Sequence, residues 1–557
     1  MVITDQKRVA NSFNHFYTNV ADNLLMKIGN TTTKYQDYLK NPNEHSFYMN
    51  EVDFGEVYKI LKNLDITKSG DIYGISPTLL KLCSREITPN LTKLFNLSLK
   101  LGQFPDKLKV AKIIPIYKGD SKLEPGNYRP ISLLPIIGKV FEKVVHERVY
   151  NFIEKYLADN QYGFQRGKST EHALLELQSK IIRAYETKLY SCSIFLDFAK
   201  AFDTVNHQIL IDKLHHYGIR GHCLNWFESY LTNRKQCVQL GKHLSEFETV
   251  KHGVPQGSIL GPLLFLVYIN DIVAASDKLE FLLFADDTSL FIANKSLKVI
   301  ENTLNEELGN ISNWLKANKL SLNVKKSNLL IFRRKNVKKM DKISVKIDGA
   351  PIEEKEFAKY LGLYFDNKMT FGKHTEHVIT KLKKGNFILA KLRYFVPEKS
   401  LRDVYFAHIQ SHVNYGALVW GSAADYHLES ITKLQKRAIK IIKFIKAREH
   451  ADLIFKNNHF LPFKILRNFC MCKFFWKFKN RLIQIPQKIL DDHRIQVNDH
   501  DPLKYVVPFS NTSYSKNSII SSGIKVWNKL PNSIKLKPFI TGFSEKCKKY
   551  LFDNMAL

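Results

Sequence analysis

The chain has 557 residues, of which 44% are hydrophobic and 25% are charged, a balance typical of a globular protein with a sizeable core. No run of 18 or more apolar residues occurs and the first residues lack the apolar segment of a signal peptide, which argues against a membrane span. The seven cysteines are odd in number and irregularly spaced, which argues against a disulfide scaffold and fits a reducing compartment. We therefore expect an intracellular protein, in the nucleus and cytoplasm, with no targeting signal identified.

The net charge of +31 is concentrated in the second part of the chain. From residue 331 to the end there are 43 Lys and Arg against 19 Asp and Glu, a net of +24, whereas the first 330 residues have a net of only +7. Because each phosphate that is neutralised releases counterions, such an excess indicates a polyanionic partner. The alternative is that the basic residues only keep a large protein in solution.

The first 95 residues are expected to form a helical extension. Residues 52–64 place apolar side chains at helical spacing, which predicts a helix. Ser76-Pro77 and Thr88-Pro89 each combine an N-cap residue with proline at the first helical position, so each pair predicts the start of a further helix.

From residue 110 the pattern changes to strands that alternate with helices. Strands are predicted at 110–118, 192–198, 237–241 and 281–292, and helices at 140–157 and 297–318. Such a mixture favours an α+β fold. After residue 366 the chain is expected to be mainly helical, with basic and aromatic residues at helical spacing. The basic side chains could follow phosphates, while the aromatic side chains could either fill a core or stack on bases.

Three aspartates follow apolar strands. Asp286 and Asp287 are adjacent within a predicted hairpin, and Asp197 ends the strand predicted at 192–198. Neighbouring carboxylates repel, which raises the pKa of one of them unless a cation compensates. A hard cation such as Mg²⁺ suits carboxylate oxygens, and two such ions can hold the attacking and leaving oxygens of a phosphoryl displacement. The alternative for the adjacent pair is an ordinary β-turn, which Asp also favours.

Several segments near these aspartates form a recognisable series. They are RPISLL (129–134), QYGFQRGKST (161–170), DFAKAFDTVNH (197–207), HGVPQGSILGPLLF (252–265), FADD (284–287), LSLNVKKSNLLIF (320–332) and YLGLYFD (360–366). In this order, over roughly residues 50–370, the chain resembles the reverse transcriptases of non-LTR retrotransposons, most of all the jockey-type or wider LINE-like group. Phe284 replaces the commoner tyrosine, a variant that this group tolerates.

The resemblance implies the fold of a right-hand polymerase. Residues 96–366 would form the fingers and palm, 367–470 a thumb-like helical region, and 471–557 a mainly helical, basic C-terminal extension. It also implies an activity: extension of a DNA primer on an RNA template from dNTPs, with two Mg²⁺ ions, or Mn²⁺ in their place, at Asp197, Asp286 and Asp287. The backbone carbonyl of Phe198 would reach a metal as well.

The resemblance further assigns substrate contacts. These residues are Lys118 and Arg129 for the triphosphate, Phe202 as the aromatic gate that excludes a 2′-hydroxyl, Gln256 and Gly257 beside template and nucleotide, and Lys326 near the leaving pyrophosphate. Three of these assignments have a plain structural alternative. Phe202 could be a core aromatic residue, and Lys118 or Lys326 could lie on a solvated face, the latter because Lys325 adjoins it.

Other functions remain open at this stage. An RNA-dependent RNA polymerase shares a palm and an Asp-Asp turn, and a catalytically silent, host-retained nucleic-acid-binding protein would keep the same sequence pattern. Cys470 and Cys472 lack a second pair at zinc-finger spacing, so zinc is not expected. The resembling region begins near residue 50, which leaves too few residues for a preceding endonuclease, and we expect a fragment or truncated copy of a longer element protein.

Overall fold

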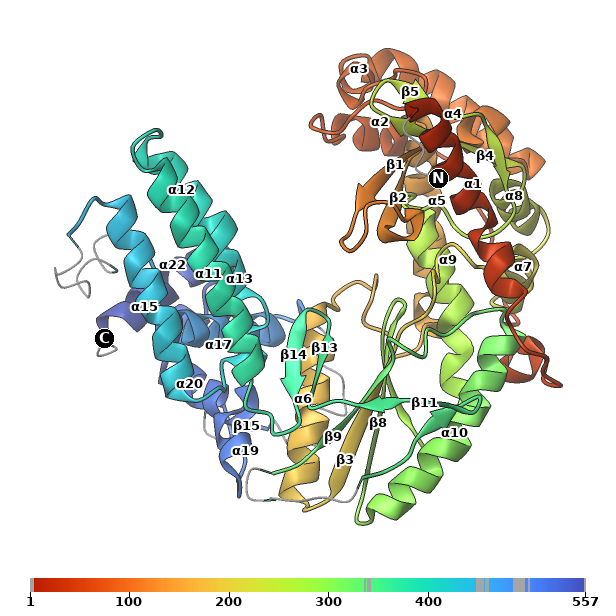
Figure 1. Cartoon of the computed structure of the whole chain (residues 1–557). Helices are drawn as coiled ribbons and strands as arrows, with labels where there is room; N and C mark the ends of the chain where they lie inside the picture. The colour runs from red at the N-terminus through yellow and green to blue at the C-terminus, as the bar shows by residue number, and fades with distance from the viewer. Residues whose placement is uncertain are drawn as a thin grey trace.

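The computed structural model describes residues 5–334, 337, 342–446, 455, 460–483, 496–498 and 501–554. Figure 1 shows a central sheet with an arm on each side. The N-terminal part of the chain forms one arm, of helices and strands, and helices from the C-terminal third form the other. The mixture of helices and strands expected from the sequence is confirmed.

The central sheet has the strand order β12-β9-β3-β8-β7. Its strands are β3 (Tyr190–Leu196), β7 (Glu280–Phe284), β8 (Asp287–Asn294), β9 (Asn328–Phe332) and β12 (Glu353–Glu354). β3 runs antiparallel to both of its neighbours, β8 and β9. Alternate β3 residues enter two cores: Ile194 packs in the core that contains α10 (Leu297–Ala317), and Phe195 in the core that contains α6 (Thr170–Glu186). Because both faces are covered, every β3 residue after the first is buried.

A second sheet lies in the N-terminal arm. It is formed by β1 (Val110–Tyr117), β2 (Tyr128–Leu133), β4 (Arg234–Leu240), β5 (His243–Leu244) and β6 (Glu248–Val250). β1 pairs antiparallel with β2 and parallel with β4, so two segments more than 100 residues apart in sequence lie side by side. The first helix, α1 (Gln6–Leu25), packs on this sheet, where its Phe13 shares a small core with Ile113 and Val238.

Helices complete the N-terminal arm and join it to the central sheet. They include α2 (Phe54–Lys62), α3 (Pro77–Leu82), α4 (Ser84–Leu101), α5 (Ile136–Ile153), α7 (His207–His216), α8 (His222–Leu231) and α9 (Leu260–Ile269). Ser76 caps α3 as predicted, with its side chain accepting from the Leu79 amide. The helix start predicted at Thr88 is wrong, because α4 begins at Ser84 and continues through Pro89. The Thr88 hydroxyl instead bonds the Ser84 carbonyl inside that helix.

The C-terminal third is mainly helical, as predicted. After the hairpin β13 (Phe357–Tyr360) and β14 (Leu363–Asp366) come α11 (Gly372–Leu392), α12 (Glu398–Tyr405), α13 (Ser411–Asn414), α14 (Ala417–Trp420), α15 (Asp425–Ile442), α17 (Phe463–Lys479), α20 (Ile524–Lys529) and α22 (Ile540–Asp553). Many of the aromatic residues are core residues, among them Phe475 and Trp527, whereas Tyr394 and Phe395 are 75% and 83% exposed. These helices share their core with α6 and one face of the central sheet.

Two of the boundaries expected from the sequence fall inside helices. The boundary between 95 and 96 lies within α4, and that between 470 and 471 lies within α17. The division into four regions stays a prediction. In the portion of the chain with a described conformation, no helix combines the length and apolarity that crossing a membrane requires.

Candidate active site

The three candidate aspartates lie at the same edge of the central sheet. Leu196, the last residue of β3, pairs with Thr288 of β8, so Asp197 leaves β3 beside the β7–β8 turn. In that turn Phe284 pairs with Asp287, which leaves Ala285 and Asp286 as the two turn residues. The register of two antiparallel strand pairs therefore brings together residues that are about ninety positions apart in sequence.

The aspartates also influence one another electrostatically. Burial and the charge of Asp197 raise the pKa of Asp286, while Arg129 and Lys118 act in the opposite direction. Asp287 is open to solvent on one side, yet burial on the others and the charges of Asp286 and Asp197 raise its pKa to about 6. Like charges in a partly desolvated place produce such shifts when no cation offsets them.

A loop after α10 holds the end of β3. The Asn323 amide donates to the Asp197 carbonyl at 2.8 Å, and the Ser327 hydroxyl accepts from the Asp197 amide at 3.2 Å. Phe198 pairs with Leu322 in an isolated antiparallel bridge. The same loop contains Lys326, so the predicted pyrophosphate residue lies on the segment that fixes Asp197.

Basic side chains from the N-terminal arm reach the same region. Lys118 follows β1, and Arg129 lies in β2 opposite Ile116. Burial and the charges of Arg129 and Lys326 lower the pKa of Lys118, whereas Asp203 and Asp197 raise it. The structure therefore brings Lys118, Arg129 and Lys326 within electrostatic range of one another and of the aspartates.

Phe202 is half-buried and contacts two aromatic rings. Its ring stacks on Phe265 of α9, with centroids 4.3 Å apart and planes 20° apart, and meets Phe164 edge to face at 6.4 Å. Its carbonyl accepts from the Val254 amide at 2.9 Å. The position fits a ring that is held rigidly beside a substrate, and it also fits a peripheral core residue.

Gln256 and Gly257 lie in a loop that is hydrogen-bonded to Asp203 and to strand β2. The Gln256 side chain donates to Asp203 at 2.7 Å, and its carbonyl accepts from the Ser132 amide of β2 at 2.9 Å. Gly257 has φ +129°, and a Cβ there would lie 2.5 Å from the Ser132 carbonyl oxygen. Only glycine fits this conformation and this approach, so the loop closes tightly on the β1–β2 hairpin.

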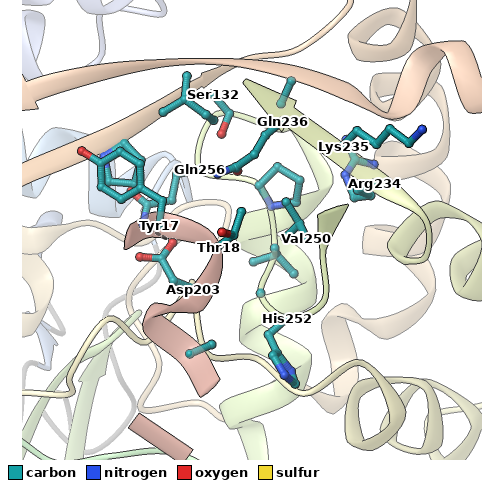
Figure 2. Close-up of a pocket in the computed structure, with 17 residues that line it drawn as sticks. Tyr17, Thr18, Ser132, Asp203, Arg234, Lys235, Gln236, Val250, His252 and Gln256 are labelled. Carbon is teal, nitrogen blue, oxygen red and sulfur yellow. Dashed lines mark hydrogen bonds between the residues drawn. The ribbon is translucent and has the colours of Figure 1, made fainter. Parts of the chain in front are cut away.

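Sequence reasoning missed several residues of this site. Asp203 lies inside the 197–207 motif but had no role assigned; burial raises its pKa, and Lys200 and the bond from Gln256 lower it. Asp203, Gln256 and Tyr17 of α1 line a pocket of about 60 Å³. Figure 2 shows how these three side chains lie. Tyr17 gave no local signal, because its proximity to this loop arises from the packing of α1 on a distant sheet. Asp22 of α1 also bonds His252 at 3.0 Å.

Carboxylate oxygens are the available donors for a metal at this edge. Within the residues that the structure describes, however, no group of three or more His, Cys, Asp or Glu side chains is arranged to hold a metal ion. Asp197 is close enough to Asp286 and Asp287 to raise their pKa values, although the three side chains do not form a set of three ligands. Their chemistry still fits Mg²⁺ or Mn²⁺, because both ions prefer oxygen ligands.

The family model that matches this chain and three of its relatives are described as reverse transcriptases or RNA-directed DNA polymerases. Residues 116–365 match the family described as reverse transcriptase (RNA-dependent DNA polymerase). The chain is 29% identical over 437 residues to the probable RNA-directed DNA polymerase from transposon BS of Drosophila melanogaster, which covers 74% of this chain and 47% of that protein. It is 31% identical over 373 residues to the corresponding X-element protein of the same species, covering 65% and 41%.

A third relative is the RNA-directed DNA polymerase from mobile element jockey of Drosophila melanogaster. It is 28% identical over 426 residues, covering 73% of this chain and 45% of that protein. The chain thus spans about half the length of the curated relatives it matches.

Proposed function

We propose that the chain is a reverse transcriptase of the non-LTR, LINE-like retrotransposon kind, which its matched family and its relatives support. It would extend a DNA primer on an RNA template by phosphoryl transfer at Asp197, Asp286 and Asp287. The main support is the convergence of these carboxylates at one edge of the sheet, with the raised pKa values of Asp286 and Asp287 and with basic neighbours. Anionic and cationic side chains that face one site suit a substrate in which a metal-bound triphosphate is transferred.

In this proposal the aspartates hold two divalent cations. Mg²⁺, or Mn²⁺ in its place, would bind Asp197, Asp286, Asp287 and the carbonyl of Phe198, and would supply charge stabilisation at the attacking and leaving oxygens. Within the described residues these side chains do not already form a group of three ligands. Lys118, Arg129 and Lys326 would neutralise the triphosphate and the pyrophosphate.

Two further contacts would select the substrate. The ring of Phe202, held by stacking on Phe265, would leave no room for a 2′-hydroxyl and so favour dNTPs over NTPs. Gln256 and Gly257 would bring backbone close to template and nucleotide, and the lack of a Cβ at Gly257 permits that approach.

We propose that the regions around the site form the fingers, palm and thumb of a right-hand polymerase. Residues 96–366 would be the fingers and palm, 367–470 the thumb, and 1–95 and 471–557 the N-terminal and basic C-terminal extensions. Lysines exposed on α11, such as Lys383 and Lys384, support a role of the C-terminal helices in template and primer binding. All seven cysteines are free thiols, which supports the proposed intracellular location.

Primer extension on an RNA template tests the proposal and separates it from its alternatives. Incorporation of dNTPs in preference to NTPs, dependent on a divalent cation, is the expected result. Preferential use of NTPs would indicate an RNA polymerase. Tight RNA binding without incorporation of either substrate would indicate a silent nucleic-acid-binding protein.

A further inference from the structure

The segment Asn160–Gly163 lies along the outer edge of β7 and reaches the turn that contains Asp286. The Leu283 amide donates to the Asn160 carbonyl at 2.9 Å, and the Tyr162 amide donates to the Leu283 carbonyl at 2.7 Å. Gln161 and Leu283 form an isolated parallel bridge. The segment therefore extends the central sheet by a short piece of backbone, directly before the catalytic turn.

The side chain of Gln161 continues this contact into the turn itself. Its amide oxygen accepts from the Ala285 amide at 3.0 Å and from the Gly163 amide at 2.8 Å. Gln161 is only 2% exposed, and Ala285 only 4%. Two backbone donors aimed at one atom fix the orientation of the side-chain amide, because its nitrogen could not accept from either.

Ala285 needs such a contact because its backbone is strained. Its φ is +55°, in the left-handed region that residues other than glycine seldom adopt. Asp286 directly follows Ala285. The backbone conformation of Ala285 therefore sets the direction in which Asp286 leaves the turn. The geometry of the turn thus depends on an acceptor from outside the hairpin.

Gly163 packs against the same peptide from a second side. A Cβ on Gly163 would lie 2.5 Å from the Ala285 nitrogen and 3.0 Å from the Phe284 carbonyl carbon. Both atoms are backbone, so they could yield only if the turn moved. The turn is therefore held by a hydrogen bond on one side and by close packing on another.

The side-chain nitrogen of Gln161, unlike the side-chain oxygen, makes no hydrogen bond with a described residue, although it is buried. A buried, unpaired amide nitrogen lowers stability rather than raising it. The side chain is thus better explained by what its oxygen does at Ala285 than by a contribution to folding.

We propose that Gln161 is a positioning residue for polymerisation, which acts by fixing the Ala285 peptide and thereby the orientation of Asp286. The proposal rests on the proposed function, since it assigns the turn to catalysis. It requires only an acceptor oxygen at this place, so glutamate should replace glutamine and an apolar side chain of similar size should not.

Four variants of the full chain separate this role from a structural one. Gln161→Met removes the acceptor, Gln161→Glu keeps it, and Gly163→Ala displaces the same peptide sterically. Asn160→Leu is the matched control: Asn160 donates to the Phe281 carbonyl at 3.1 Å, so it joins the same two segments at the far end of β7. The measurements are the single-turnover incorporation rate at saturating dNTP, the Mg²⁺ midpoint, the fraction of active sites, RNA–primer affinity and thermal stability.

Loss of a group that orients a metal ligand typically costs about 10–100-fold in activity or metal affinity, and Gln161→Met and Gly163→Ala should show losses of that order. Their RNA–primer affinity and active fraction should stay unchanged, and Gln161→Glu and Asn160→Leu should stay near the wild type. A near-normal rate in Gln161→Met, or a loss that only follows the active fraction or thermal stability, would overturn the positioning role.

A readout without catalysis distinguishes failure of this inference from failure of the proposed function. Amide hydrogen exchange of peptides covering residues 281–290 should be faster in Gln161→Met than in the wild type or in Gln161→Glu. A wild-type chain that does not polymerise would contradict the proposed function, yet the exchange would still test the hydrogen bond. Equal exchange in all three proteins would show that Gln161 does not hold the turn.

Discussion

The candidate active site and the C-terminal helices differ in the sign and in the placement of their charged residues. At the site, three aspartates stand at the ends of two strands, and strand register determines where each one lies. In the C-terminal region, basic residues are spread over several helices, and α11 alone has five lysines against one glutamate. In the proposed function, phosphoryl transfer would depend on a few fixed positions, whereas binding of RNA and primer would depend on the sum of many interchangeable basic residues.

The two regions nevertheless share a buried core. Leu174 of α6 and Leu330 of β9 share a buried core with Trp420 and other residues of the C-terminal helices. Removal of the C-terminal third would expose this face of the central sheet. Point substitutions in the full chain therefore test the two regions better than truncation does.

The largest effect is expected at the aspartates. Asp197→Asn and Asp286→Asn should each lower the incorporation rate by roughly three orders of magnitude or more, since a metal ion supplies several kcal/mol of charge stabilisation. RNA–primer affinity should change little, because other residues provide the positive charge. Primer extension and RNA binding are measured on the same preparations, with the exposed Asp277→Asn as control. Near-full polymerisation by either variant would contradict the two-metal assignment.

The shared core gives the next prediction. Leu330 is fully buried between the central sheet and the C-terminal helices. Leu330→Ala should lower the free energy of unfolding by about 2–5 kcal/mol, because it leaves a cavity. Chemical denaturation followed by two probes, one in each region, should show a single transition shifted for both. Leu97→Ala, at a half-exposed position on α4, serves as control; separate transitions would show that the regions fold independently.

A smaller effect is expected at Phe202. Phe202→Val should open space beside the sugar and lower the dNTP-to-NTP selectivity by roughly ten- to hundredfold, with a smaller change in dNTP use. Phe202→Tyr keeps the ring and should keep the selectivity. The measurement is the ratio of kcat/KM for the two substrates. An unchanged ratio in a folded Phe202→Val protein would make Phe202 a core residue only.

The smallest effect concerns the basic surface. Reversing the charges of Lys383, Lys384 and Lys391 on α11 should reduce the dependence of log K on log salt, by about 0.7–0.9 for each phosphate that the protein then fails to neutralise. The control reverses Lys59, Lys93 and Lys100, which are exposed on helices of the N-terminal arm. RNA–primer affinity is measured at several salt concentrations. Equal slopes for both triple variants and the wild type would show that α11 is only a solvated surface.

Short motifs made much of the site predictable. The aspartates lie in or beside apolar strands, as the sequence indicated, and the loop that contains Lys326 holds Asp197. The roles of Phe202, Gln256 and Lys326 stay predictions. The interactions that orient these residues were not predictable. Gln161 and Ala285 are 124 positions apart, and nothing in either segment indicates a hydrogen bond between them.

Tertiary packing also overrode local signals elsewhere. The cap signal at Thr88 gave a false helix start, because the threonine can satisfy its hydroxyl within a longer helix. The basic and aromatic pattern of the C-terminal third did not say which rings face solvent. Trp476 is buried and Phe395 is exposed, and only the packing of the helices decides between them.

The most direct test of the central claim is metal-dependent extension by the wild-type chain. A primer annealed to RNA is bound in the presence of a chelator, dNTPs are added, and Mg²⁺ or Mn²⁺ is then supplied in excess. The account predicts that the primer–template stays bound throughout, that no extension occurs before the metal is added, and that DNA synthesis begins when either ion is present. Extension in the presence of the chelator, or binding without synthesis after either ion is supplied, would contradict it.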